Sequence, residues 1–139
     1  MISIFLSINN NEEVFELPVV PEELEKQSPW QNEEFETMRQ QLNLIGLKGL
    51  ESLEISSFFP IRDYPFLRSR EMWGMEYVET IERWRNRRLP LRLVITNDNP
   101  HGFKLNEAVT IDEFNYRTGK NGDIYYTMSL KWFPFVKVN

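Results

Sequence analysis

The sequence predicts an α+β fold that is mostly β: an antiparallel β-sandwich or a partly closed barrel with one flanking α-helix. Apolar and polar residues alternate with a period of two along residues 52–57 and 124–132, which is typical of strands with one wet face. An Asn-Gly pair precedes the second of these runs and predicts a hairpin. Apolar residues recur with helical spacing between Met75 and Arg88.

The length and composition predict one domain spanning residues 1–139. A chain of 139 residues can build one core, and 41% hydrophobic with 27% charged residues is ordinary for a globular protein. The absence of cysteine excludes disulfides and thiolate chemistry. Residues 1–8 are apolar but lack the basic leader of a signal peptide and are too short to span a bilayer, so we expect a first strand and no membrane partner.

The N-terminal half contains several short strands. Ile2–Pro18 predicts two strands around the turn triplet Asn9–Asn11, and Glu22–Gln41 predicts short strands in a polar segment. Leu42–Ile45 predicts a strand that a tight turn at Gly46–Gly49 connects to a second strand beginning near Leu50. Pro60 ends that second strand.

The segment after Pro60 is expected to be an irregular loop, from Ile61 to Gly74, that carries unusually bulky side chains. A helix is predicted over Met75–Arg88, ended by Pro90. Its apolar stripe consists of Tyr77, Val78, Ile81 and Trp84, in line with Arg88.

The last third predicts three strands. Leu91–Thr96 is a continuous apolar strand, and Val109–Tyr116 and Ile124–Trp132 flank the turn that contains Asn121-Gly122. The apolar phase slips between Ile111 and Phe114, which indicates a β-bulge.

Catalytic, metal and cofactor sites are not expected, and we interpret the protein as a non-enzyme. His101 is the single histidine and falls in a turn, so a solvated loop residue is the favoured interpretation. Gly46–Gly49 lacks the spacing of a phosphate loop. Carboxylates Glu76, Glu79 and Glu82 lie beside arginines and indicate a solvated helix face.

Charge is unevenly distributed along the chain. The net charge of -5 argues against nucleic acid as a partner. Nine glutamates precede position 40, whereas eight arginines lie between positions 62 and 92. Four of these arginines gather at the end of the predicted helix: Arg83, Arg85, Arg87 and Arg88. They either complement the helix dipole or meet the acidic N-terminal third of a neighbouring copy in a head-to-tail ring.

The bulky loop and the arginines are the candidate interface. The stretch from Phe58 to Trp73 is either a flap over the core or an exposed interface patch, and the interface is favoured. The candidate protein-interface residues are Phe59, Tyr64, Phe66, Trp73, Arg83, Arg85, Arg87 and Arg88.

Several segments together resemble a known family over nearly the whole chain. They are Phe15–Glu25, Leu42–Leu50, Ile55–Pro60, Asp63–Pro65, Tyr77–Arg85, Pro90–Thr96, Val109–Phe114 and Gly122–Tyr126. In this order they resemble the N-terminal domain of tail proteins from PBSX-like prophages. Members usually carry a C-terminal LysM peptidoglycan-binding module, and the sequence ends at Asn139 without one. The resemblance therefore implies either a member that dispensed with this module or a relative reduced to the assembly domain.

The resemblance implies a tail-tube-like structural component of a contractile-tail baseplate. Its implied partners are the tail tube protein, the central hub or spike proteins, and further copies in a six-fold ring. Its implied location is the virion, with the host cytoplasm during assembly. The alternative function is a carbohydrate or peptidoglycan-binding module that uses Trp30, Trp73 and Tyr64 as stacking platforms. A hydrolase is the least favoured class, since no spacing forces two carboxylates together.

Overall fold

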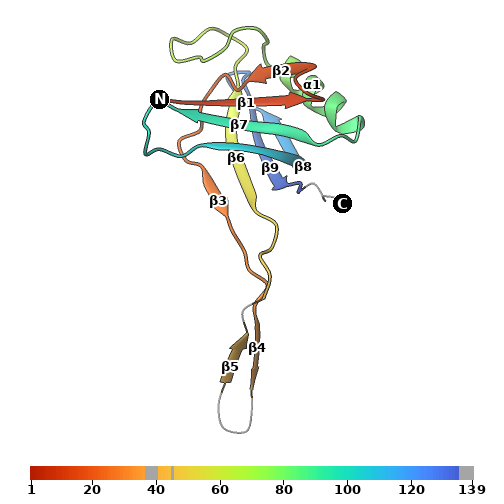
Figure 1. The fold of residues 1–139 in the computed structure, drawn as a ribbon. Coiled ribbons are helices and arrows are strands. Elements are labelled where there is room, and N and C mark those ends of the chain that lie inside the picture. Colours follow the sequence, from red (N-terminus) through yellow and green to blue (C-terminus); the bar gives the residue numbers. More distant parts are fainter. Residues whose placement is uncertain (37–40, 45, 135–139) are drawn as a thin grey trace.

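A computed structural model describes residues 1–36, 41–44 and 46–134. In this part of the chain, helix α1 follows six of the nine strands (Figure 1). The elements are β1 (Ile2–Ile8), β2 (Glu13–Glu16), β3 (Glu25–Gln27), β4 (Glu33–Glu36), β5 (Gln41–Leu44), β6 (Ser52–Phe59), α1 (Met75–Asn86), β7 (Leu91–Asn97), β8 (Leu105–Thr118) and β9 (Ile124–Trp132).

The body is one seven-stranded antiparallel sheet with the order β2-β1-β7-β8-β9-β6-β3, which confirms the predicted α+β, mostly β class. The sheet is open, because β2 and β3 are its two edges. Strand β8 connects its two halves: residues 105–109 pair with β7, and residues 109–118 pair with β9. The predicted bulge is confirmed between Ile111 and Glu113, where β8 bends (Figure 1).

The predicted hairpins at the two ends of the chain are confirmed. Asn9, Asn10 and Asn11 all have positive φ, which asparagine tolerates better than most residues, and they connect β1 to β2. At the other end, Gly122 has φ 94° in the turn between β8 and β9. This turn therefore needs glycine at that position.

Helix α1 covers the inner face of the sheet. Its residues Tyr77, Val78, Ile81 and Trp84 are all buried, as the stripe predicted. The predicted helix was too long at its C-terminal end: α1 ends at Asn86, and Arg88 has φ 56° and is exposed, so it does not continue the stripe. Pro90, which cannot donate a backbone hydrogen bond, follows that reversal.

Phe59 lies at the centre of the core, and its assignment to an interface was wrong. Its ring stacks between Tyr77, at a centroid distance of 4.7 Å, and Tyr126, at 4.1 Å, and its side chain is 0% exposed. Burial also raises the pKa of Tyr126. Residues of β6 alternate faces, so Phe58 lies on the outer face instead.

Strands β4 and β5 pair with each other and form a two-stranded arm that extends from the body (Figure 1). The ribbon continues to the body through the Trp30↔Lys48 bridge and the Gly49 N–H to Pro29 O bond of 2.8 Å. The predicted tight turn at Gly46–Gly49 was therefore wrong. A Cβ at Gly46 would collide with the carbonyl of Gln31, so this glycine allows two chain segments of the arm to approach closely.

Candidate interaction surfaces

The first candidate surface is the arginine-rich end of α1, and most of its charge is already paired within the chain. The guanidinium of Arg83 donates two hydrogen bonds to the carboxylate of Glu13 in β2, at 2.6 and 2.9 Å, in a bidentate arrangement. The indole N–H of Trp84 donates to the same carboxylate at 3.0 Å. These bonds, that from Arg83 above all, lower the pKa of Glu13 to about 2. The hairpin β1–β2 is thereby fastened to the helix.

The other three arginines of this cluster differ from one another. Arg87 pairs with Glu12, and Arg85 pairs with Glu82 one turn earlier at 3.0 Å. Arg88 is exposed, and its side chain makes no hydrogen bond or ion pair with the described residues. Arg83 and Arg87 were proposed to meet acidic residues of a neighbouring copy, but their acidic partners belong to the same chain. Of the four arginines, Arg88 is therefore the one available to bind another molecule.

A groove of about 500 Å³ opens beside Arg88, and we call it the basic groove. Its described lining combines the end of α1, the Leu89–Leu91 segment and β8. Leu89 is 40% exposed there. The residues that line it are Glu82, Arg85, Asn86, Arg88, Leu89, Pro90, Leu91, Thr110, Ile111 and Phe133.

The second surface is an aromatic patch on the outer face of β6 and β9, formed by Phe58, Tyr64, Phe66 and Tyr125. Phe58 contacts the other three rings at centroid distances of 5.5–6.3 Å, and Tyr64 stacks on Phe66 at 5.1 Å. Phe66 is 52% exposed. The sequence indicated Tyr64 and Phe66, and Phe58 as the first residue of the bulky stretch, but missed Tyr125, which alternation along β9 places on this face.

Buried Asp123 holds the aromatic patch in place. Its carboxylate accepts the Tyr64 hydroxyl at 2.5 Å and the Ile61 amide at 3.0 Å, and the residue is 1% exposed. This bond to Asp123 is also the main reason that the pKa of Tyr64 is raised. Further along, Leu67 is buried and Arg68 donates to Ser3 at 2.6 Å. The loop is therefore both a flap over the core and, at its outer side, an exposed patch.

The proposed sugar platform of Trp30, Trp73 and Tyr64 is not brought together, because Trp30 lies far from Tyr64. Trp73 is half-buried at the start of α1, where its amide donates to Glu76. Trp30 is in the arm, near the end of β9 that Trp132 occupies, whereas Tyr64 is at the Asp123 end. Nine strand residues separate these ends by roughly 30 Å, too far for one stacking platform.

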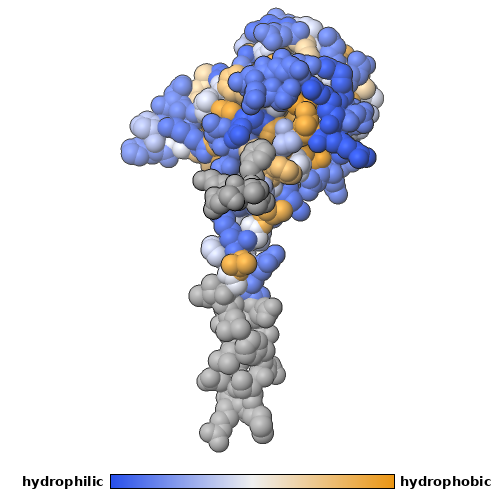
Figure 2. All heavy atoms as spheres, turned by 45° about the vertical axis from the view of Figure 1, so that its right-hand side comes forward, coloured by the Kyte–Doolittle hydropathy of each residue, from blue (hydrophilic) through white to orange (hydrophobic). Residues whose placement is uncertain are grey.

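The third surface lies where the arm joins the body. Lys26 and Lys48 both pair with Glu51, which is 7% exposed, and their hydrogen bonds, that from Lys26 first, lower its pKa. Hydrophobic side chains remain exposed around this charged centre: Trp30 at 55%, Leu47 at 79% and Leu50 at 49%. Figure 2 shows hydrophobic atoms on the lower body and upper arm of an otherwise mostly hydrophilic face.

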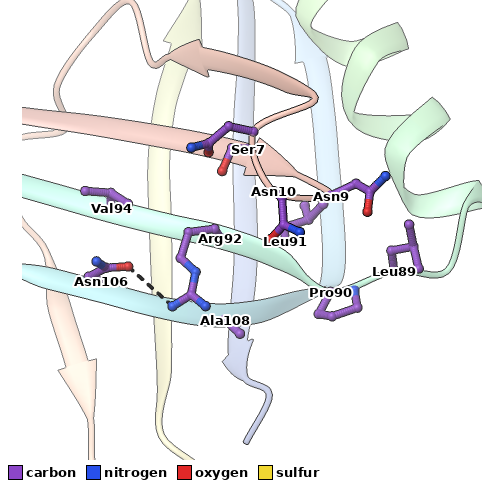
Figure 3. A pocket seen from close by; sticks show the side chains of 11 residues that line it. Ser7, Asn9, Asn10, Leu89, Pro90, Leu91, Arg92, Val94, Asn106 and Ala108 are labelled. Carbon is purple, nitrogen blue, oxygen red and sulfur yellow. Dashed lines mark hydrogen bonds between the residues drawn. The ribbon is translucent and has the colours of Figure 1, made fainter. Parts of the chain in front are cut away.

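An open groove of about 630 Å³ lies across the outer face of β1, β7 and β8 (Figure 3). The guanidinium of Arg92 donates to Asn106 at 3.3 Å, and the asparagine turn and Leu89-Pro90 close one end. The lining offers amides and one cation, with Ser7 the only hydroxyl. Arg92 is thus engaged at the outer face of the sheet.

Within residues 1–36, 41–44 and 46–134, no group of three or more His, Asp or Glu side chains is arranged to hold a metal ion. His101 is exposed in the turn between β7 and β8, with its amide bonded to Asn99 at 2.9 Å. No helix in the described part of the chain is long and apolar enough to cross a membrane.

Comparison with known proteins gives a similarity that covers most of the chain. No protein-family model matches the chain. The chain is 28% identical over 128 residues to the uncharacterized protein YqbP of Bacillus subtilis (strain 168). The matched region covers 89% of this chain and 56% of YqbP, so the chain spans little more than half the length of that relative.

Proposed function

We propose that this protein is a non-enzymatic structural component of a contractile-tail baseplate that connects the tail tube to the central hub or spike through protein–protein contacts in a ring. The arm is the observation that carries the proposal. A two-stranded ribbon is marginally stable in water by itself, and β4 and β5 pair with no other described strand. A projecting ribbon of this kind gains stability when it binds a partner surface.

Two further observations support a role in assembly. Exposed hydrophobic side chains surround the arm base, and the aromatic patch presents Phe66 on the outer face of the sheet. Aromatic residues are enriched at protein interfaces and dominate their binding energy. The resemblance of the sequence to tail proteins of PBSX-like prophages supports the baseplate as the assembly, with the tail tube and hub proteins as partners.

The proposal is tested by following an arm-deleted chain into tail particles. Gly49 and Pro29 are hydrogen-bonded across the ribbon, so a short turn can replace residues 30–48 without separating the remaining chain ends. The tagged wild-type chain is expected in purified particles, together with tail tube and hub proteins identified by mass spectrometry. The arm-deleted chain is expected to fold, with a circular dichroism spectrum that retains the body, but to be lost from the particles.

Two outcomes count against the baseplate role. Purified particles that lack the wild-type chain would refute it. Retention of the chain on sedimented peptidoglycan, without any tail protein, would favour the carbohydrate-binding alternative. Phe66→Ala is the variant to compare with the arm-deleted chain, because it removes an exposed ring of the aromatic patch and leaves the arm unchanged.

A further inference from the structure

Charges that are paired within the chain are not available to bind another copy, so fewer charged surfaces remain for self-association. Three glutamates of the N-terminal third are engaged with arginines of the same chain, in the pairs Glu12–Arg87, Glu13–Arg83 and Glu16–Arg68. Arg88 has no such partner among the described residues and extends from a positive-φ position after α1. Its charge is therefore available to an outside group.

The basic groove has the chemistry to bind an acidic segment that also carries an apolar residue. Arg88 and Arg85 supply cations on one side, although Arg85 is shared with Glu82. Leu89, Pro90 and Ile111 supply apolar surface on the other side. Charged groups at the edge of an apolar contact set its specificity and its rate of association.

Strand β4 has the complementary sequence. Glu33-Glu34-Phe35-Glu36 carries three carboxylates around one aromatic residue, and the whole segment 32–44 has Arg39 as its one cation. In Figure 1 the arm leaves the body at the end away from α1. The arm of a chain therefore extends away from the basic groove of the same chain.

We propose that β4 of one copy docks in the basic groove of the next copy, so that the protein assembles head to tail. Such a contact joins two different surfaces, and it closes into a ring when the rotation between copies allows. This inference rests on the proposed function and adds the partner, a second copy of this chain, and the two surfaces that meet.

The first experiment measures self-association of the purified chain by sedimentation velocity over a range of concentrations. Arg88→Glu, and separately the triple variant Glu33→Lys, Glu34→Lys and Glu36→Lys, are expected to raise the dissociation constant at least about tenfold, since each places like charges together. A matched triple reversal of Glu22, Glu23 and Glu25, which are exposed outside the arm, is expected to change it little.

Recombining the charges gives a sharper result. A chain that carries both Arg88→Glu and the arm reversal regains opposite charges at the contact and is expected to self-associate again. An equimolar mixture of the two separate variants is also expected to associate, because each arm then meets a groove of opposite charge. Failure of both rescues, or equal loss with the matched control, would overturn the proposed contact.

Cross-linking tests the contact within particles. The chain has no cysteine, so Glu34→Cys with Arg88→Cys introduces the only thiols. Oxidation is expected to give a ladder of linked chains, whereas either single variant gives dimers at most. A purified wild-type chain that stays monomeric, with no ladder in particles that contain the double variant, overturns the inference while the baseplate role stands. Loss of the wild-type chain from particles refutes the baseplate role itself.

Discussion

Glu13→Gln tests the bond between the first hairpin and the helix. The shift of the Glu13 pKa from 4.5 to about 2 is caused first by Arg83 and then by Trp84. At face value it corresponds to about 3 kcal/mol of folding free energy. The Glu13 side chain is 36% exposed, however, and solvent screening reduces the expected loss to about 1 kcal/mol.

The dependence on pH follows from the sign of the shift. The pKa of Glu13 is lower in the folded chain than in the unfolded chain, so its contribution is complete above pH 4.5 and is lost as the pH falls toward 2. The free energies of unfolding of wild type and Glu13→Gln should therefore differ at pH 7 and converge near pH 2. Glutamine retains an oxygen for the Trp84 indole, so the comparison isolates the charge.

Urea denaturation followed by tryptophan fluorescence, at several pH values, measures this difference. Glu79→Gln, on the exposed side of α1, is the matched control for the loss of one negative charge. A difference between wild type and Glu13→Gln that stays constant from pH 7 to pH 2 would show that the ionised pair with Arg83 is not its source.

Four further variants test the core, the loop and the arm base. Phe59→Ala should lower the free energy of unfolding by about 3–5 kcal/mol in urea denaturation, because the ring is fully buried, whereas Phe66→Ala should lower it by less than about 1 kcal/mol. Asp123→Asn should return the pKa of Tyr64 toward its ordinary value, measured by ultraviolet titration. Glu51→Gln should lower the melting temperature measured by circular dichroism, with a loss of about 1 kcal/mol.

Each of these has a result that would contradict the structure. Equal stability of the two phenylalanine variants would mean that Phe59 is not in the core. An unchanged pKa of Tyr64 in Asp123→Asn would mean that the Tyr64 hydroxyl does not donate a hydrogen bond to Asp123. Wild-type melting of Glu51→Gln would mean that the two lysines are held by other groups.

The parts of the fold predicted from the sequence are those with local signals. The turn containing Gly122 and the alternation along β9 predicted the C-terminal hairpin, and the phase slip predicted its bulge. The helix was predicted because its apolar stripe is visible from the spacing of residues in consecutive helical turns. The arm was missed because Gly46 is needed for a close contact with Gln31, fifteen residues earlier. In the sequence, a glycine in a turn cannot be distinguished from a glycine at a close contact between two segments.

The candidate interface was only partly predictable for a related reason. In the Phe58-Phe59 pair, one residue must face inward and the other outward, and a shift of one residue exchanges them. Continuing the alternation of Leu53 and Ile55 to Phe59 would have placed Phe59 in the core and Phe58 on the surface. The sequence offers no local signal for Asp123 as the partner of Tyr64, since 59 residues separate them.

Part of the separation of acidic and basic residues along the chain serves to close the fold, through the pairs Glu12–Arg87, Glu13–Arg83 and Glu16–Arg68. Because β2 lies at the sheet edge nearest α1 through the Phe15–Tyr77 and Phe15–Trp84 contacts, Glu13 meets arginines from about seventy residues later. When opposite charges lie far apart in a sequence, a contact within the chain should therefore be considered before a contact between chains. The charges that have no partner among the described residues are the ones informative about assembly, and Arg88 is one of them.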